Sequence, residues 1–373
     1  MEKNYFFING KIETLSYFSK KLMDCFSDMG YGVFMSEFYN PHELRRNITG
    51  ADNTLITFNC IGVSGEEEYR NIWRSNSFKI TNILVDHPMY YHDQLVHYRD
   101  YACDDYRVIC IDSYHAEYVK RYYPDIRDVA FVPIAGSGED IDLTQVKKEY
   151  DVIFTGNFTS CHKFDPYIEQ KGPEYAQFYR GIIDDMLSDT KRPLERVCEE
   201  HILREFPDSS PDDMRLVMNN LLFVDLYVRF FLRERAIKEL YKSGANIKLV
   251  GKGFEALGLC GTALMPTAFC LNETAKARIS LNVMPWFKGG AHDRVLSSML
   301  VNTLALTDTS EWFSDNFRDG SDIVFYDNMH MENLPDIVTG LLDNPSLLCD
   351  IAQKGREKAL KSHTWRSRAE LIK

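Results

Sequence analysis

Several common signatures are missing from this sequence of 373 residues. Its nine cysteines include no CxxC pair, which favours reduced thiols over a disulfide framework or a zinc site. The most apolar stretch, residues 216–232, is interrupted by asparagine and charged residues, whereas a membrane span needs about 20 mostly apolar residues. The opening MEKNYFFINGKIETL lacks the apolar core and cleavage site of a secretion signal, so we expect a cytoplasmic protein. The cysteines are Cys25, Cys60, Cys103, Cys110, Cys161, Cys198, Cys260, Cys270 and Cys349.

The chain also lacks the net positive charge of a nucleic-acid-binding protein. Its formal net charge is -12, which argues against a general partner of nucleic acid but still allows a local basic pocket for a phosphate ligand. Two nucleotide fingerprints are absent as well. The stretch GKGFEALG does not fit GxGxxG, because its third glycine, Gly258, comes two positions late, and no GxxxxGK[ST] loop occurs.

What the sequence does contain is a regular alternation of β-like and helix-like stretches, which predicts parallel sheets covered by helices. The first series of predicted strands lies at 4–8, 31–35, 54–59, 80–86, 106–112 and 129–135. The second series lies at 150–158, 245–255, 279–285, 303–308 and 321–327.

The length favours two domains. We predict an α/β protein with two Rossmann-like domains, an N-terminal one over residues 1–145 and a C-terminal one over residues 146–373. Between the first two strands of the second series, the sequence is helical from about 164 to 243. This helical insertion is rich in aromatic residues and suits a homodimer interface, a cap over an acceptor, or an extension of the core.

The loops after the strands of the second series carry glycines and cations, where open α/β sheets bind their ligands. Glycines before a helix let backbone N–H groups approach an anion, which the helix dipole also favours. The sequence therefore predicts a diphosphate site. Its candidate residues are Gly156, Asn157, Gly251, Lys252, Gly289, Gly290, His292 and Arg294. The alternative is that residues 288–300 form a solvent-exposed turn between a strand and a helix.

In the first series, the loop DHPMYYHD follows a predicted strand and begins with Asp86 and His87. A histidine at this position could act as a general base or orient a sugar hydroxyl, because its pKa lies near the working pH. The alternative is that Pro88 turns the chain and His87 satisfies backbone groups. The pair Asp140 and Asp142 is of a type that holds a metal beside a diphosphate, but it lies in a predicted linker.

The last third of the chain, from RISLNVMPWFKGGAHDRVLSSML to GREKALKSHTW, resembles the CgeB-like glycosyltransferases, relatives of the GT-B family 4 enzymes. The resemblance implies two Rossmann-like domains facing across a cleft, with a nucleotide-sugar donor held by the C-terminal one and an acceptor by the N-terminal one. It implies no cofactor and no metal, since helix N-termini and cations offset the leaving-group charge.

Carried over by position, the resemblance places Arg294 at the donor diphosphate and Asp308, Thr309 and Ser310 along the donor cleft. It also places Ser297 where such enzymes commonly have an acidic residue that binds the nucleotide ribose. This difference leaves three explanations open: ribose is bound by another group, the donor nucleotide is unusual, or the activity is lost.

The leading hypothesis is a transferase that moves a sugar, for example from a UDP-sugar, to a protein, glycan or cell-envelope acceptor. The alternatives are a catalytically silent nucleotide-sugar-binding or assembly protein and a GT-B epimerase. The expected partners are the donor and the acceptor, with no nucleic acid.

Overall fold

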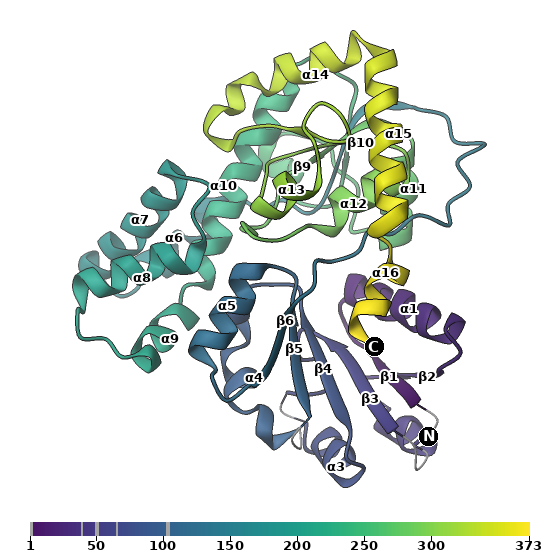
Figure 1. Cartoon of the computed structure of the whole chain (residues 1–373). Helices are drawn as coiled ribbons and strands as arrows, with labels where there is room; N and C mark the ends of the chain where they lie inside the picture. The colour runs from purple at the N-terminus through teal and green to yellow at the C-terminus, as the bar shows by residue number, and fades with distance from the viewer. Residues whose placement is uncertain (1–2, 39, 49–51, 65, 102–104) are drawn as a thin grey trace. The chain divides into compact units, whose positions relative to one another are not determined.

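The computed structural model describes residues 3–38, 40–48, 52–64, 66–101 and 105–373, so that Cys103 lies outside the described residues. The chain forms two compact units (Figure 1). Unit 1 comprises Met1–Ile134 and Trp365–Lys373, and unit 2 comprises Ala135–Thr364.

Unit 1 contains a parallel six-stranded sheet with the strand order β2-β1-β3-β4-β5-β6. All six predicted strands of the first series are confirmed. Their bounds are β1 Lys3–Asn9, β2 Gly32–Glu37, β3 Asp52–Phe58, β4 Lys79–Leu84, β5 Tyr106–Cys110 and β6 Asp128–Phe131. The helices of this unit are α1 Glu13–Asp28, α2 Pro41–Arg46, α3 Glu67–Ser75, η1 Pro88–Tyr91, α4 His92–Val96, η2 Tyr98–Asp100, α5 Ser113–Tyr122 and α16 Trp365–Ile372.

The apolar stripe of α1 explains how this helix packs on the sheet. Leu15, Phe18, Leu22 and Phe26 recur at helical spacing and are buried, as the sequence predicts. The ring of Phe26 stacks on Tyr5 of β1 with 4.0 Å between ring centroids. The middle residues of β1 and β3 are buried, as expected for a parallel sheet covered on both faces.

The last helix, α16, belongs to unit 1 although it follows unit 2 in the sequence. Its Trp365 lies 5.0 Å from the ring of Phe18, and Nη2 of Arg368 donates to the carbonyl of Ile134 at 3.2 Å. The compact units therefore divide at 134/135 and 364/365, whereas we predicted a single border at 145/146. The helix α16 belongs to unit 1 because Trp365 packs against α1. The helical spacing of apolar residues in the sequence does not show this contact.

Unit 2 contains a parallel five-stranded sheet with the strand order β11-β10-β9-β7-β8. All five predicted strands of the second series are confirmed: β7 Tyr150–Thr155, β8 Ile247–Val250, β9 Ala277–Asn282, β10 Leu304–Thr307 and β11 Val324–Phe325. The helices after β8 are η4 Phe254–Leu257, α11 Thr267–Ala275, α12 Asp293–Leu300, α13 Glu311–Asn316, η5 Asn328–Asn333, α14 Leu334–Leu342 and α15 Pro345–Ser362.

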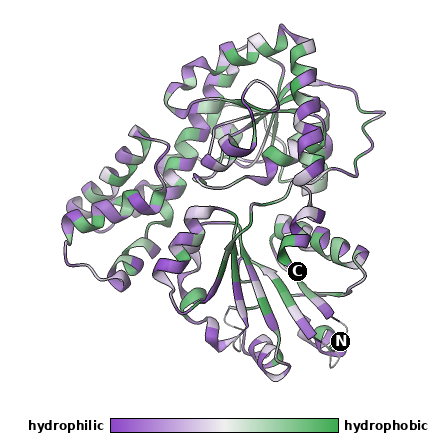
Figure 2. Ribbon diagram, viewed as in Figure 1, coloured by the Kyte–Doolittle hydropathy of each residue, from purple (hydrophilic) through white to green (hydrophobic). Residues whose placement is uncertain are grey.

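The predicted helical insertion between β7 and β8 is confirmed. It consists of η3 Cys161–Phe164, α6 Asp165–Glu169, α7 Pro173–Ser188, α8 Leu194–Glu205, α9 Pro211–Asn219 and α10 Leu222–Tyr241. Hydrophilic and hydrophobic residues alternate along α7 and α8, as expected for helices buried on one face only (Figure 2). No helix among the described residues is long and apolar enough to cross a membrane.

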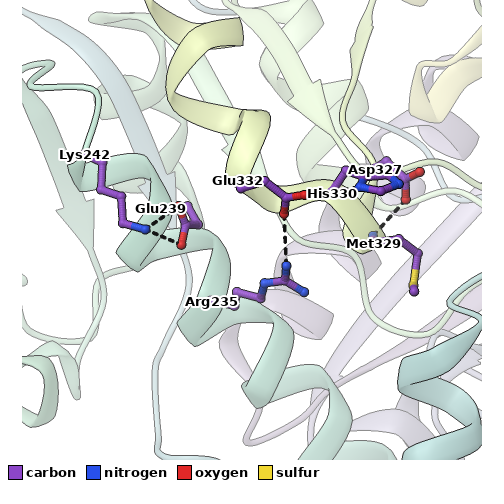
Figure 3. Close-up of polar contacts among 7 residues, drawn as sticks. All are labelled: Arg235, Glu239, Lys242, Asp327, Met329, His330 and Glu332. Atoms are coloured by element: carbon purple, nitrogen blue, oxygen red, sulfur yellow. Dashed lines mark hydrogen bonds and ion pairs between the residues drawn. The ribbon is translucent and has the colours of Figure 1, made fainter.

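The longest helix of the insertion, α10, is attached to the segment that follows β11 (Figure 3). Nη2 of Arg235 donates to Oε2 of Glu332 in η5 at 3.2 Å, and His330 Nδ1 lies 3.2 Å from the other oxygen of this carboxylate. At the end of α10, Lys242 pairs with Glu239 at 2.6 Å. The Arg235–Glu332 pair is exposed and links α10 to η5, whereas the Lys242–Glu239 pair lies within the end of α10 itself.

Candidate functional site

Two glycine loops meet beyond the carboxyl ends of β7 and β8. Gly156 and Gly251 have φ angles of 147° and 137°, a region that side-chain-bearing residues rarely adopt. Gly156 N–H donates to the carbonyl of Val250 at 2.8 Å, and Lys252 N–H donates to Oδ1 of Asn157 at 3.1 Å. A Cβ atom on Gly251 would collide with the backbone of Gly156. The structure thus brings together Gly156, Asn157, Gly251 and Lys252, which we had predicted to share one site.

Arg294 points from the first turn of α12 to the same place. Its Nη1 donates to the carbonyl of Thr155 at 2.8 Å. A Cβ atom on Gly156 would lie only 2.6 Å from this nitrogen, so a larger residue there would displace the guanidinium. Burial lowers the pKa of Arg294, and the nearby charge of Arg229 acts in the same direction.

His292 is the residue that precedes α12, and its side chain lies between two charges. Nδ1 is 3.0 Å from Oδ1 of Asp293 and 3.2 Å from the backbone N of Arg294, and Nε2 is 3.3 Å from Nη2 of Arg294. A backbone N–H can only donate, so Nδ1 accepts from Arg294 and the His292 side chain caps the first turn of α12. Burial and the charge of Arg294 lower the pKa of His292 to about 4, which keeps the ring neutral near pH 7.

Two further arginines reach this site from α10 of the insertion, and the sequence analysis missed both. Nη1 of Arg233 donates to the carbonyl of Asn157 at 2.5 Å. Arg229, four residues earlier and therefore on the same helix face, forms an ion pair with Asp225 at 3.1 Å. Burial, and then the charges of Arg294 and Arg229, lower the pKa of Arg233 well below its usual value.

The three arginines Arg229, Arg233 and Arg294 form what we call the arginine cluster. Among the described residues, Nε of Arg233 and Nε of Arg294 are buried without a hydrogen-bond partner. Unpaired cationic groups are costly to bury, and buried polar atoms without a partner call for a ligand or an ion. The arrangement is therefore suited to binding an anion.

Gly289 and Gly290 lie in the turn before α12. Both are buried, and neither has a positive φ angle. Ser310 Oγ donates to the carbonyl of Gly290 at 2.6 Å and accepts from the N–H of Phe313 at 3.1 Å, so that Ser310 caps α13 and holds this turn. Ser310 thus supports the turn through its hydroxyl group.

Asp308 follows β10 and is buried. Oδ1 accepts from the N–H of Met284 at 2.8 Å, and Oδ2 accepts from the amide of Asn328 at 3.0 Å. Burial raises the pKa of Asp308, and the charge of Lys288 opposes this shift. The carboxylate therefore ties the loop after β9 to the segment after β11.

Ser297 is buried in the second turn of α12. Its Oγ accepts from the N–H of Ser137 at 2.9 Å, and a Cβ atom on Gly136 would lie 2.8 Å from the backbone N of Ser297. The structure therefore places Ser297 against the chain segment that precedes β7. In this position its hydroxyl group satisfies a buried backbone donor.

Asp86 and His87 belong to unit 1, just after β4. Oδ2 of Asp86 accepts from Asn59 Nδ2 at 3.1 Å and from the hydroxyl of Tyr91 at 3.2 Å. His87 is 4% exposed, its Nδ1 accepts from the N–H of Met89 at 3.1 Å, and its ring lies 4.5 Å from that of His115. His87 thus satisfies a backbone group, and its catalytic role stays a prediction.

Comparison with known proteins gives a family match over part of the chain and a fold for the whole of it. A family described as glycosyl transferase-like matches residues 229–373. No curated protein sequence gives a significant match. An alpha-glucosyltransferase solved with UDP and a 13-mer DNA is 11% identical over 100% of both chains, with a TM-score of 0.57. A sucrose-phosphate synthase from Thermosynechococcus elongatus is 8% identical over 100% of this chain and 97% of its own, with a TM-score of 0.52.

The chain has the GT-B fold. AviGT4, a glycosyltransferase involved in avilamycin A biosynthesis, is also similar, with 12% identity, a TM-score of 0.51, and coverage of 99% of this chain and 95% of its own. TarM aligns at 11% identity with 88% of this chain and a TM-score of 0.49, and this chain spans 56% of TarM. The family match covers residues 229–373, and the solved structures show the fold alone. They do not single out the CgeB-like group.

Proposed function

We propose that this protein transfers a sugar from a nucleoside diphosphate sugar to a hydroxyl-bearing acceptor on a protein, a glycan or the cell envelope, in the cytoplasm and without a metal ion. The observation that carries the proposal is the arginine cluster. Two of its guanidinium groups, those of Arg233 and Arg294, converge on the glycine loop at Gly156 and Asn157, and each has a buried Nε without a partner.

The chemistry of glycosyl transfer needs such a site. When the bond between the sugar and the diphosphate breaks, negative charge develops on the leaving diphosphate. Cationic groups that are already in place, and partly removed from water, stabilise this charge more strongly than water does. The lowered pKa values of Arg233 and Arg294 indicate electrostatic repulsion and burial that a bound diphosphate would offset.

UDP is the first nucleotide to test, because the structurally similar alpha-glucosyltransferase was solved with UDP. Isothermal titration with UDP-, GDP-, TDP- and CMP-linked sugars tests donor binding. We expect one donor to bind, and both Arg294→Gln and Arg233→Gln to weaken its binding about tenfold or more, as expected for loss of a charge-assisted hydrogen bond. Arg235→Gln is the matched control, because it removes the same charge from α10 at an exposed ion pair.

The proposal fails if none of the donors binds to the folded parent protein, or if the Arg294 and Arg233 variants bind as tightly as the Arg235 variant. A thermal melt of each variant separates loss of binding from loss of folding. This control is needed because both arginines also donate hydrogen bonds to loop carbonyls.

A catalytically silent donor-binding protein is the second candidate, and one observation favours it. The hydroxyl of Ser297, at the position where related enzymes carry an acidic residue for the ribose, is already engaged by Ser137. Hydrolysis of the bound donor separates the two functions, since an active transferase releases the sugar slowly to water and a pure binder does not. If hydrolysis occurs, Asp86 and His87 are our candidates for acting on the acceptor, so Asp86→Asn should reduce transfer more than hydrolysis.

A further inference from the structure

Unit 1 has polar side chains on one face of its sheet, where a doubly covered parallel sheet is normally apolar. Residues paired in register point to the same face, as do residues two apart in one strand. The pairs Tyr5 with Thr54, Thr54 with Lys79, Thr81 with Arg107 and Arg107 with Asp128 therefore share a face. This polar row consists of Tyr5, Thr54, Lys79, Thr81, Arg107 and Asp128.

The polar row forms part of the wall of a cavity of about 610 Å³, a size that suits a small organic ligand. The cavity lies at the amino ends of β1, β4, β5 and β6, whereas Asp86 and His87 follow the carboxyl end of β4. Among the described residues, seven basic and three acidic side chains line it, in a protein whose net charge is -12. The basic residues are Lys3, Arg74, Lys79, Arg99, Arg107, Arg127 and Lys373, and the acidic ones are Asp105, Asp125 and Asp128.

The acidic groups only partly neutralise this cavity. Lys79 pairs with Asp52 at 3.1 Å, but Arg99 and Arg107 lie 3.5 Å from Asp125 and Asp128, respectively. These last two distances are longer than a charge-assisted hydrogen bond, and both carboxylates are more than 60% exposed. Such ion pairs are weak and leave the guanidinium groups able to bind another anion.

Arg107 is the lining residue with the clearest unsatisfied donor. Its side chain is 28% exposed, its Nη1 makes a long 3.4 Å contact with the carbonyl of Ile372, and its Nε is buried without a hydrogen bond. The hydroxyl groups of Tyr5 and Thr54 on the same row are likewise buried without a partner among the described residues. Unsatisfied buried donors that border a basic cavity are the expected sign of a ligand or ion.

We propose that this cavity binds a phosphate monoester of a small metabolite, with the phosphate at Arg107 and the nearby cations. A phosphate monoester carries close to two negative charges near pH 7 and offers three oxygens, which suits a cavity lined by several cations. The size of the cavity and the negative net charge of the protein favour a small molecule over nucleic acid or a lipid surface. The site lies in unit 1 and is separate from the arginine cluster of unit 2.

Phosphorus NMR and isothermal titration with inorganic phosphate and glucose 6-phosphate test the proposal on the full chain. We expect both to bind, and Arg107→Gln to weaken binding about tenfold. Arg127→Gln, at an exposed position of the cavity rim, should weaken it about threefold. Lys120→Gln on α5 removes one charge outside the cavity and should leave binding unchanged.

Each alternative result contradicts the proposal in a different way. Absence of binding at about 10 mM phosphate, or equal binding by the Arg127 and Lys120 variants, would overturn it even if Arg107→Gln fails to fold. Displacement of phosphate by UDP would assign the phosphate to the arginine cluster instead. If the protein bound anionic vesicles but not the soluble phosphates, the ligand of this cavity would be a lipid surface, which contradicts the proposal. Because the arginine cluster is not involved, failure here leaves the proposed transferase function standing.

Discussion

His292 is held neutral by its surroundings, and this has a consequence for stability. Burial and the charge of Arg294 lower its pKa to about 4 in the folded protein, from 6.5 for the unperturbed side chain. Below pH 6.5 protons therefore bind the unfolded chain more readily than the folded one. The contribution of His292 to stability is complete above pH 6.5 and decreases as the pH falls toward 4.

We expect the free energy of unfolding of the parent protein to fall by up to about 3 kcal/mol more than that of His292→Asn between pH 6.5 and pH 4. Asparagine also serves well at the position before a helix, so the variant should fold. Urea unfolding of both proteins across this range measures the difference. If the free energy of unfolding changed equally with pH in both proteins, His292 would not be buried as a neutral group.

At the scale of elements, the loops after β7 and β8 depend on glycine at particular positions. Gly251 has a φ of 137°, and a Cβ atom there would collide with the carbonyl group of Gly156. Gly258 also has a positive φ, of 70°, but a Cβ atom there has no neighbour within 4 Å. A substitution of Gly258 therefore tests backbone strain alone, whereas a substitution of Gly251 tests backbone strain together with a steric clash.

We expect Gly258→Ala to reduce the free energy of unfolding by about 1 kcal/mol, the cost of the left-handed backbone for alanine. Gly251→Ala should cost about 2 kcal/mol or more, because the neighbouring loop must also move. It should in addition weaken donor binding, which Gly258→Ala should not. Urea unfolding and donor titration of both variants measure these effects. If both variants lost the same stability and the same donor affinity, the close contact between the loops at Gly156 and Gly251 would have no effect on either.

The sequence predicts all eleven strands and the insertion, because apolar runs bounded by turn residues are a local signal. It also identifies Arg294 and Gly156 as partners, since both follow strands of one parallel sheet. Arg233 could not be found in this way. A cation on the buried face of α10 contradicts the apolar pattern of the helix, and only the tertiary contact with Asn157 shows why it is there. The spacing of Arg229 and Arg233 was the one available signal.

At the scale of the whole molecule, the order of elements along the chain differs from their grouping in space. The chain completes unit 2 and then returns to unit 1 with α16. Trp365 of this helix is 2% exposed and packs on Phe18 and Phe58, with 5.0 and 6.3 Å between ring centroids. The hydrophobic core of unit 1 is therefore incomplete without the last nine residues of this sequence.

Truncation of a buried aromatic residue costs about 3–5 kcal/mol, so Trp365→Ala should loosen unit 1. We expect amide hydrogen exchange to increase in α1 and β3, while β7, β9 and β10 of unit 2 keep the protection of the parent protein. Phe313→Ala, which truncates a fully buried ring of unit 2, is the matched control and should produce the reverse pattern. If Trp365→Ala increased exchange equally in both sheets, the two units would unfold as one, and the grouping of α16 with unit 1 would have no energetic meaning.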